Sequence, residues 1–134
     1  RDSGFGLTNG GAVAKITSFK DLESWQAAME VAESCYLLTK RSPLSEQYGL
    51  TAQMRRAAVS VASNIAEGHR RTRAGYVHHL QIGVGSLAEL ETQLELAQRL
   101  GFASSDAAAP FQKSLVRAGQ LLHALLRSLR TPVS

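Results

Sequence analysis

Residues 47–70, QYGLTAQMRRAAVSVASNIAEGHR, decide the fold of this chain. The stretch is rich in alanine, and its larger apolar residues recur every three or four positions, which places them on one face of an α-helix. The pattern predicts a helix from about Ser45 or Glu46 to Gly68, because glycine commonly follows a last helical turn. Its expected core stripe is Leu50, Met54, Ala57, Val61 and Ile65.

Three further stretches show the same spacing and predict three more helices. The first is expected from Phe19 or Lys20 to Arg41 with Ser18 as its cap, the third from Thr72 to Gly101, and the fourth from Ser105 to Arg130. The expected core positions are Leu80, Gly83, Leu87, Leu90, Leu94 and Ala97 in the third helix, and Phe111, Leu115, Ala118, Leu122, Leu125 and Leu129 in the fourth.

Four helices of comparable length joined by three short connections predict an all-α fold. The expected arrangement is an antiparallel, up-down-up-down four-helix bundle over residues 19–130. Residues 1–18 are rich in glycine and lack an apolar signal core, so we expect them to be a disordered leader or a remnant of cloning. Residues 131–134 are expected to be a short tail.

The first expected helix is apolar on two adjacent faces. The stripe expected to face the core is Leu22, Trp25, Met29, Ala32 and Tyr36. The second stripe is Ala28, Val31, Cys35 and Leu38. Together they exceed the ~100° arc that packing within a bundle requires. Large apolar patches are rare on monomeric proteins, so we expect the second stripe to form the interface of a homo-oligomer.

Composition narrows the class of protein. At 134 residues the chain has the length of one domain. Apolar residues make up 44% of it and aromatic residues only 6%, which favours helices over a sheet. It has no run of 18 apolar residues, so we expect no membrane span and a cytoplasmic protein. Cys35 is the only cysteine, and we expect it to be buried and inert.

Five arginines form the most function-like cluster in the sequence: Arg55, Arg56, Arg70, Arg71 and Arg73. Guanidinium groups suit bidentate contacts with phosphate, and a net charge of +4 is compatible with nucleic-acid binding. The cluster also has a simpler interpretation, in which cations are merely solvated at the C-terminus of a helix, where the dipole favours them.

A third interpretation of the cations is pairing between helices. The first and third expected helices are rich in glutamate, whereas the fourth carries Lys113 and Arg117. This segregation suggests electrostatic pairing within or between subunits. Glu89 or Glu91 are then the expected partners of Arg55 and Arg56.

The sequence shows no catalytic or metal-binding constellation. Asn64 and Glu67 lie near the core stripe of the second expected helix, and we expect them to form an orienting polar network rather than a general base. The four histidines lack metal-ligand spacing, and Ser60, Ser63 and Ser86 lack a recognisable histidine or aspartate partner. We therefore expect a non-enzymatic protein without cofactor or metal.

Residues 53–68, QMRRAAVSVASNIAEG, and 85–101, GSLAELETQLELAQRLG, closely resemble the bacterial four-helix-bundle family named after proteins encoded in 23S rRNA intervening sequences. The resemblance extends from about Phe19 to Leu129 and implies assembly as a cyclic homopentamer. This family is similar in turn to the accessory variability determinant of diversity-generating retroelements. That relative forms a basic pentameric barrel, binds nucleic acid and contacts a reverse transcriptase. A reverse transcriptase is therefore a partner by analogy only.

Two functional hypotheses follow. The first is a non-enzymatic, homo-oligomeric helical bundle that binds RNA or DNA, or a protein that handles nucleic acid, through its Arg-rich surface. The alternative is a purely structural or assembly protein whose charges serve subunit pairing.

Overall fold

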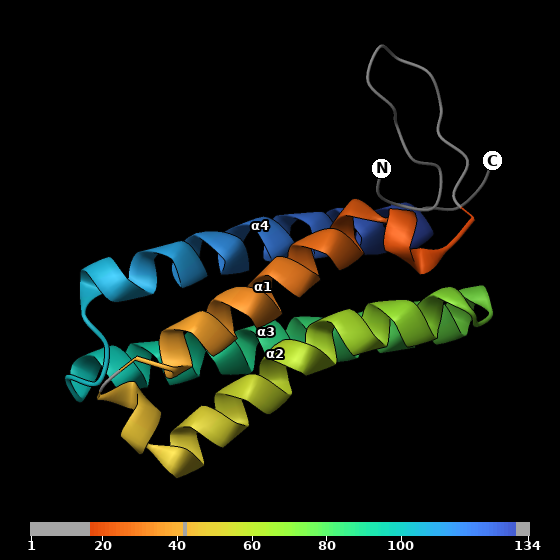
Figure 1. Ribbon diagram of the computed structural model, residues 1–134. Helices are drawn as coiled ribbons and strands as arrows, with labels where there is room; N and C mark the ends of the chain where they lie inside the picture. Colours follow the sequence, from red (N-terminus) through yellow and green to blue (C-terminus); the bar gives the residue numbers. More distant parts are fainter. Residues whose placement is uncertain (1–16, 42, 131–134) are drawn as a thin grey trace.

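The computed structural model describes residues 17–41 and 43–130 (Figure 1). These residues form the α-helices α1 Glu23–Thr39, α2 Tyr48–His69, α3 Arg73–Arg99 and α4 Ser105–Arg130. Two short 3-10 helices, η2 Phe19–Asp21 and η3 Leu44–Glu46, precede α1 and α2. No strand occurs in this part of the chain, and the all-α prediction is confirmed. Most of the expected leader and the whole expected tail lie outside the described residues.

The four α-helices pack around one core. Helix α1 contacts α2 and α4, and α3 contacts the same two helices, so each helix has two neighbours (Figure 1). The expected core positions of α3 are all buried, and in α2 and α4 only Leu50 and Leu129 remain half-buried. The 3–4 spacing therefore identified the inner faces of these three helices correctly.

The chain enters α1 differently from the expected single helix. The side chain of Ser18 accepts a hydrogen bond from the backbone N–H of Lys20, and the Asp21 carboxylate accepts one from the backbone N–H of Ser18. This capping box closes the 3-10 turn, after which Leu22 is extended and fully buried. Thr17 also forms hydrogen bonds to the Asp21 carboxylate, so residues 17 and 18, which were expected to belong to the leader, contact the folded chain.

The expected oligomer interface on α1 is wrong. Ala28, Val31, Cys35 and Leu38 are buried in the core of a single chain, between α2 and α4. The stripe that was expected to face the core is the more exposed one, with Met29 37% and Tyr36 40% exposed. Both stripes repeat every three to four residues, so periodicity could not distinguish them. Within the stripe that was expected to face the core, Leu22 is fully buried and Trp25 and Ala32 are half-buried, so only Met29 and Tyr36 are exposed.

Two glycines lie near the ends of α2 and α3 and have different roles. A Cβ atom on Gly68 would lie 2.8 Å from the Cβ of His79 and 3.0 Å from Cδ1 of Tyr76, so this glycine permits close contact between the two helices. It lies within the last turn of α2, not beyond it as expected. Gly101 has a φ of +77° and follows the end of α3, a conformation that glycine adopts without strain.

Among the described helices, none combines the length and the apolar character that crossing a bilayer requires.

Candidate nucleic-acid interface

The chain gathers arginines at one end of the helices. Arg70 and Arg71 lie on the connection between α2 and α3, and Arg73 is the first residue of α3. The Nε atom of Arg73 donates a hydrogen bond of 2.6 Å to the backbone carbonyl of Leu129. This contact brings the last turn of α4 to the same place. We call the resulting group the Arg-rich end: Arg70, Arg71, Arg73, Arg127 and Arg130.

The helix termini explain why cations are stable there. Both α2 and α4 finish at the Arg-rich end, and the negative ends of their dipoles favour positive charge, whereas α3 begins there and the positive end of its dipole opposes this effect in part. Arg70, Arg71 and Arg73 are recognisable from the sequence as one cluster, whereas Arg127 and Arg130 are not. The two groups of arginines are brought together by the contact between Arg73 and Leu129. That contact depends on how α3 and α4 pack and cannot be predicted from a single sequence.

Two of these arginines have additional contacts within the chain. The guanidinium carbon of Arg70 lies 6.0 Å from the centroid of the Phe19 ring. Arg71 forms an ion pair with Glu67, one turn earlier in α2. The hydrogen bond from Arg71, and then its charge, lower the pKa of the Glu67 carboxyl below its ordinary value. Both arginines remain exposed, and a guanidinium has five N–H donors, so these contacts leave capacity for phosphate.

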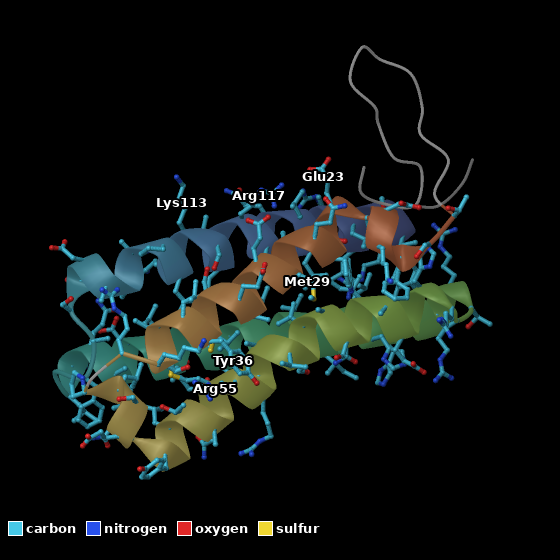
Figure 2. The ribbon with its side chains drawn as sticks, in the orientation of Figure 1. Glu23, Met29, Tyr36, Arg55, Lys113 and Arg117 are labelled. Atoms are coloured by element: carbon cyan, nitrogen blue, oxygen red, sulfur yellow. The ribbon has the colours of Figure 1, made fainter. Side chains whose placement is uncertain are left out.

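Arg55 belongs to a different environment. Its guanidinium carbon lies 4.4 Å from the centroid of the Tyr36 ring, and its Nε donates a 2.9 Å hydrogen bond to Oγ1 of Thr39 (Figure 2). It therefore joins α2 to α1. Fifteen residues of helix separate it from Arg70, which corresponds to ~22 Å. The expected pairing of Arg55 with Glu89 or Glu91 is wrong, since no ion pair of that kind occurs in residues 17–41 and 43–130.

Arg56 is exposed and also lies away from the Arg-rich end. It lines a shallow polar groove between α2 and α3, together with Gln53, Ser60, Ser86, Glu89 and Gln93. Arg56 and Glu89 line the same groove but form no ion pair, so within residues 17–41 and 43–130 the expected pairing of Arg56 with Glu89 or Glu91 is wrong as well. The five arginines that are close in sequence are therefore divided among three places.

Pairing between helices also occurs on α1 and α4. The guanidinium nitrogens of Arg117 lie 3.6 Å from a carboxylate oxygen of Glu23 and 3.7 Å from one of Glu30 (Figure 2). The segregation of acids and bases thus serves, at least here, to join helices of one chain. Such partly exposed pairs contribute little to stability, ~0–1 kcal/mol each.

Asn64 lies in a polar network between α2 and α3. Its amide nitrogen donates to the backbone carbonyl of Ser60 at 2.9 Å and to the Ser60 hydroxyl at 3.1 Å. Its Oδ1 lies 3.0 Å from Nδ1 of His79, which must carry the proton of this hydrogen bond. Oγ of Ser86 donates to Oγ of Ser60 at 2.9 Å. Glu67 is not part of this network, contrary to expectation, because it is exposed and pairs with Arg71.

The network has the form of a structural link between two helices. A serine nucleophile needs its base within direct hydrogen-bonding distance, whereas here the amide of Asn64 separates Ser60 from His79. His79 and Ser86 were not predicted as partners of Asn64 and Ser60. The available signal was spacing: Ser60 and Asn64 are four residues apart, and His79 and Ser86 are seven apart, so each pair lies on one helix face.

The remaining candidate for chemistry is Cys35. Burial raises the pKa of its thiol to about 12, and the nearby charge of Arg55 opposes that shift only in part. A thiol that stays protonated is a poor nucleophile and a poor metal ligand. The described residues also contain no group of three histidine, cysteine, aspartate or glutamate side chains arranged to hold a metal ion.

Comparison with known protein families identifies the chain. The profile of the 23S rRNA-intervening sequence protein family matches residues 20–124. The match covers most of the chain, which therefore belongs to this family. A search of curated proteins gives no significant match.

Proposed function

We propose that this member of the 23S rRNA-intervening sequence protein family is a non-enzymatic, homo-oligomeric helical bundle that binds nucleic acid through its Arg-rich end. The observation that carries the proposal is the contact between Arg73 and Leu129, which unites arginines from the α2–α3 connection and from α4. Clustered guanidinium groups attract phosphate and release its counterions. The link of the family to 23S rRNA supports RNA as the partner, which would place the protein in the cytoplasm.

The proposed architecture is an antiparallel, up-down-up-down bundle. Contacts between α2 and α3 support this order, because Asn64 contacts His79 whereas the earlier Ser60 contacts the later Ser86. Partners that move in opposite directions along the sequence are those of antiparallel helices. The proposed assembly is a cyclic homopentamer, by resemblance to the family. Exposed Met29 and Tyr36 on α1 supply apolar surface for self-association.

The function is tested by equilibrium binding of fluorescently labelled RNA. We expect the triple variant Arg70→Gln, Arg71→Gln and Arg73→Gln to bind more weakly than the parent, with little dependence on RNA sequence, because phosphate contacts carry no sequence information. A matched control removes three charges at the opposite end of the helices, with Lys40→Gln, Arg41→Gln and Arg99→Gln. Equal losses of affinity in the two triple variants would show that net charge, not the Arg-rich end, drives binding.

One observation favours a second candidate function. Arg117 pairs with two glutamates of α1 and Arg71 pairs with Glu67, so part of the positive charge is used within the chain. On this view the protein is a purely structural or assembly component whose charges serve pairing. A parent protein that assembles but has no measurable affinity for RNA or DNA at ~50 mM salt would support this alternative, or recruitment through a protein partner such as a reverse transcriptase.

A further inference from the structure

Aromatic rings lie among the arginines of the Arg-rich end. Phe19 contacts the Arg70 guanidinium. The centroids of the Phe19 and Trp25 rings are 5.4 Å apart, and the two ring planes form an angle of 64°. Next to Arg70, His69 meets Tyr76 edge to face, with the ring centroids 5.8 Å apart. Phe19 and His69 are half-buried, so each ring is held by packing while part of it remains exposed.

These rings are fixed in place before any ligand arrives. Phe19 begins the 3-10 turn that the capping box of Ser18 and Asp21 closes, and the following Leu22 is anchored in the core. His69 closes α2 directly beyond Gly68, where α2 and α3 are in close contact. Rigid rings lose little conformational freedom on binding, which favours affinity.

We propose that the Arg-rich end binds unpaired rather than duplex nucleic acid, with bases stacking on Phe19, on His69 and on the guanidinium plane of Arg70. This inference rests on the proposed function of the same surface. Bases of a single strand expose their faces to aromatic rings and to arginine. In a duplex both faces of each base are covered by neighbours, so the rings would contribute nothing. Phosphate contacts by themselves would not favour the single strand.

The inference is tested by comparing two probes of equal length at the same ionic strength: a labelled single-stranded RNA without self-complementarity, and its blunt duplex. We expect the parent to bind the single strand about tenfold more tightly, the effect of one stacked base. Arg70→Lys keeps the charge but removes the planar group. It should weaken single-strand binding severalfold more than it weakens duplex binding, because the loss of bidentate phosphate contacts affects both probes and the loss of stacking affects only the single strand. Because Arg70 is exposed, the variant is expected to fold normally.

A second pair of variants isolates the ring. Phe19→Leu removes the aromatic face while keeping apolar bulk, and Phe102→Leu makes the same change in a half-buried ring at the opposite end. Only Phe19→Leu should reduce the preference for the single strand. Equal affinity of the parent for both probes, or a preference for the duplex, would overturn the inference and leave the proposed function intact. No binding to either probe at ~50 mM salt would overturn both.

Discussion

The side chain of Arg73 hydrogen-bonds to the backbone carbonyl of Leu129, a residue 56 positions later in the chain. That carbonyl is among the last four of α4, which have no partner within the helix. Arg73 therefore completes the end of α4 in addition to placing charge at the Arg-rich end. Arg73 thus has both a stabilising contact and a proposed role in binding. If its substitution weakens binding, the stability of the variant must be measured as well.

Replacing Arg73 with Gln should lower the free energy of unfolding by ~0.5–1 kcal/mol, because the substitution removes an exposed charge-assisted hydrogen bond to the last turn of α4. Urea denaturation followed by circular dichroism measures this change. The control is Arg56→Gln, which removes an exposed cation from the middle of α2, away from both helix ends, and should change stability by less than ~0.5 kcal/mol. An Arg73 variant as stable as the parent would show that the hydrogen bond to Leu129 contributes nothing.

The core makes a prediction about Gly83 and Leu122. A Cβ atom on Gly83 would lie 3.3 Å from Cδ2 of the buried Leu122, so the two positions share one space. Leu122→Ala should cost ~2–5 kcal/mol, whereas the same truncation at exposed Val116 should cost less than ~0.5 kcal/mol. Adding Gly83→Ala to the Leu122 variant should recover up to ~1 kcal/mol through helix propensity. In the parent, Gly83→Ala should stabilise the protein less, because the Leu122 side chain occupies the space that the new methyl group needs. If Gly83→Ala changed stability equally in the parent and in the Leu122→Ala variant, the two positions would not be coupled.

Cys35 makes stability depend on alkaline pH. Burial raises the pKa of its thiol from an ordinary 9.0 to about 12, so the unfolded chain loses this proton first. The stabilising contribution is complete below pH 9 and declines as the pH rises towards 12. Urea denaturation between pH 8.5 and 10 should show a steeper loss of stability for the parent than for Cys35→Ala. Parallel curves for the two proteins would contradict this assignment. Burial also raises the pKa of Tyr76, from an ordinary 10.0 to about 12. Above pH 10 the ionisation of Tyr76 would add its own loss of stability, so the measurement stops there.

Self-association should depend on the exposed stripe of α1. Light scattering at micromolar concentration should give an oligomeric mass for the parent, and Met29→Glu should shift it towards the monomer, because a charge would enter an apolar contact. Val116→Glu on α4 is the matched control and should leave the mass unchanged. A monomeric parent would eliminate the proposed assembly. Dissociation by Val116→Glu alone would move the interface to α4.

Local patterns predicted the elements of the fold well. The bounds of α4 are those expected, since the spacing of its leucines is regular. Pro110 is the sixth residue of α4 and lies inside the helix, where its ring removes one backbone hydrogen bond. The inward face of α1 was predicted wrongly, because Ala28 and Met29 are adjacent on a helix that is apolar over a wide arc. Which stripe turns inward depends on how α2 and α4 pack against it, and that is not a local property.

The candidate site was less predictable than the fold. Arg70, Arg71 and Arg73 were found because they are close in sequence. Their junction with α4 required the contact to Leu129. Only part of the polar network was predicted. Asn64 was identified, but His79, which bonds to it, and Ser86, which bonds to Ser60, lie on another helix. The spacing within each helix was visible in the sequence, but it does not say which faces of the two helices meet.

The salt dependence of RNA binding tests the central claim most directly. The account predicts that the logarithm of the binding constant of the parent falls linearly with the logarithm of salt concentration. It further predicts that substituting Arg70, Arg71 and Arg73 with Gln lowers the slope by ~0.7 for each phosphate of a single strand that the variant no longer neutralises. The control triple at Lys40, Arg41 and Arg99 should keep the slope of the parent. Equal slopes for the parent and the Arg70, Arg71 and Arg73 variant would contradict the account.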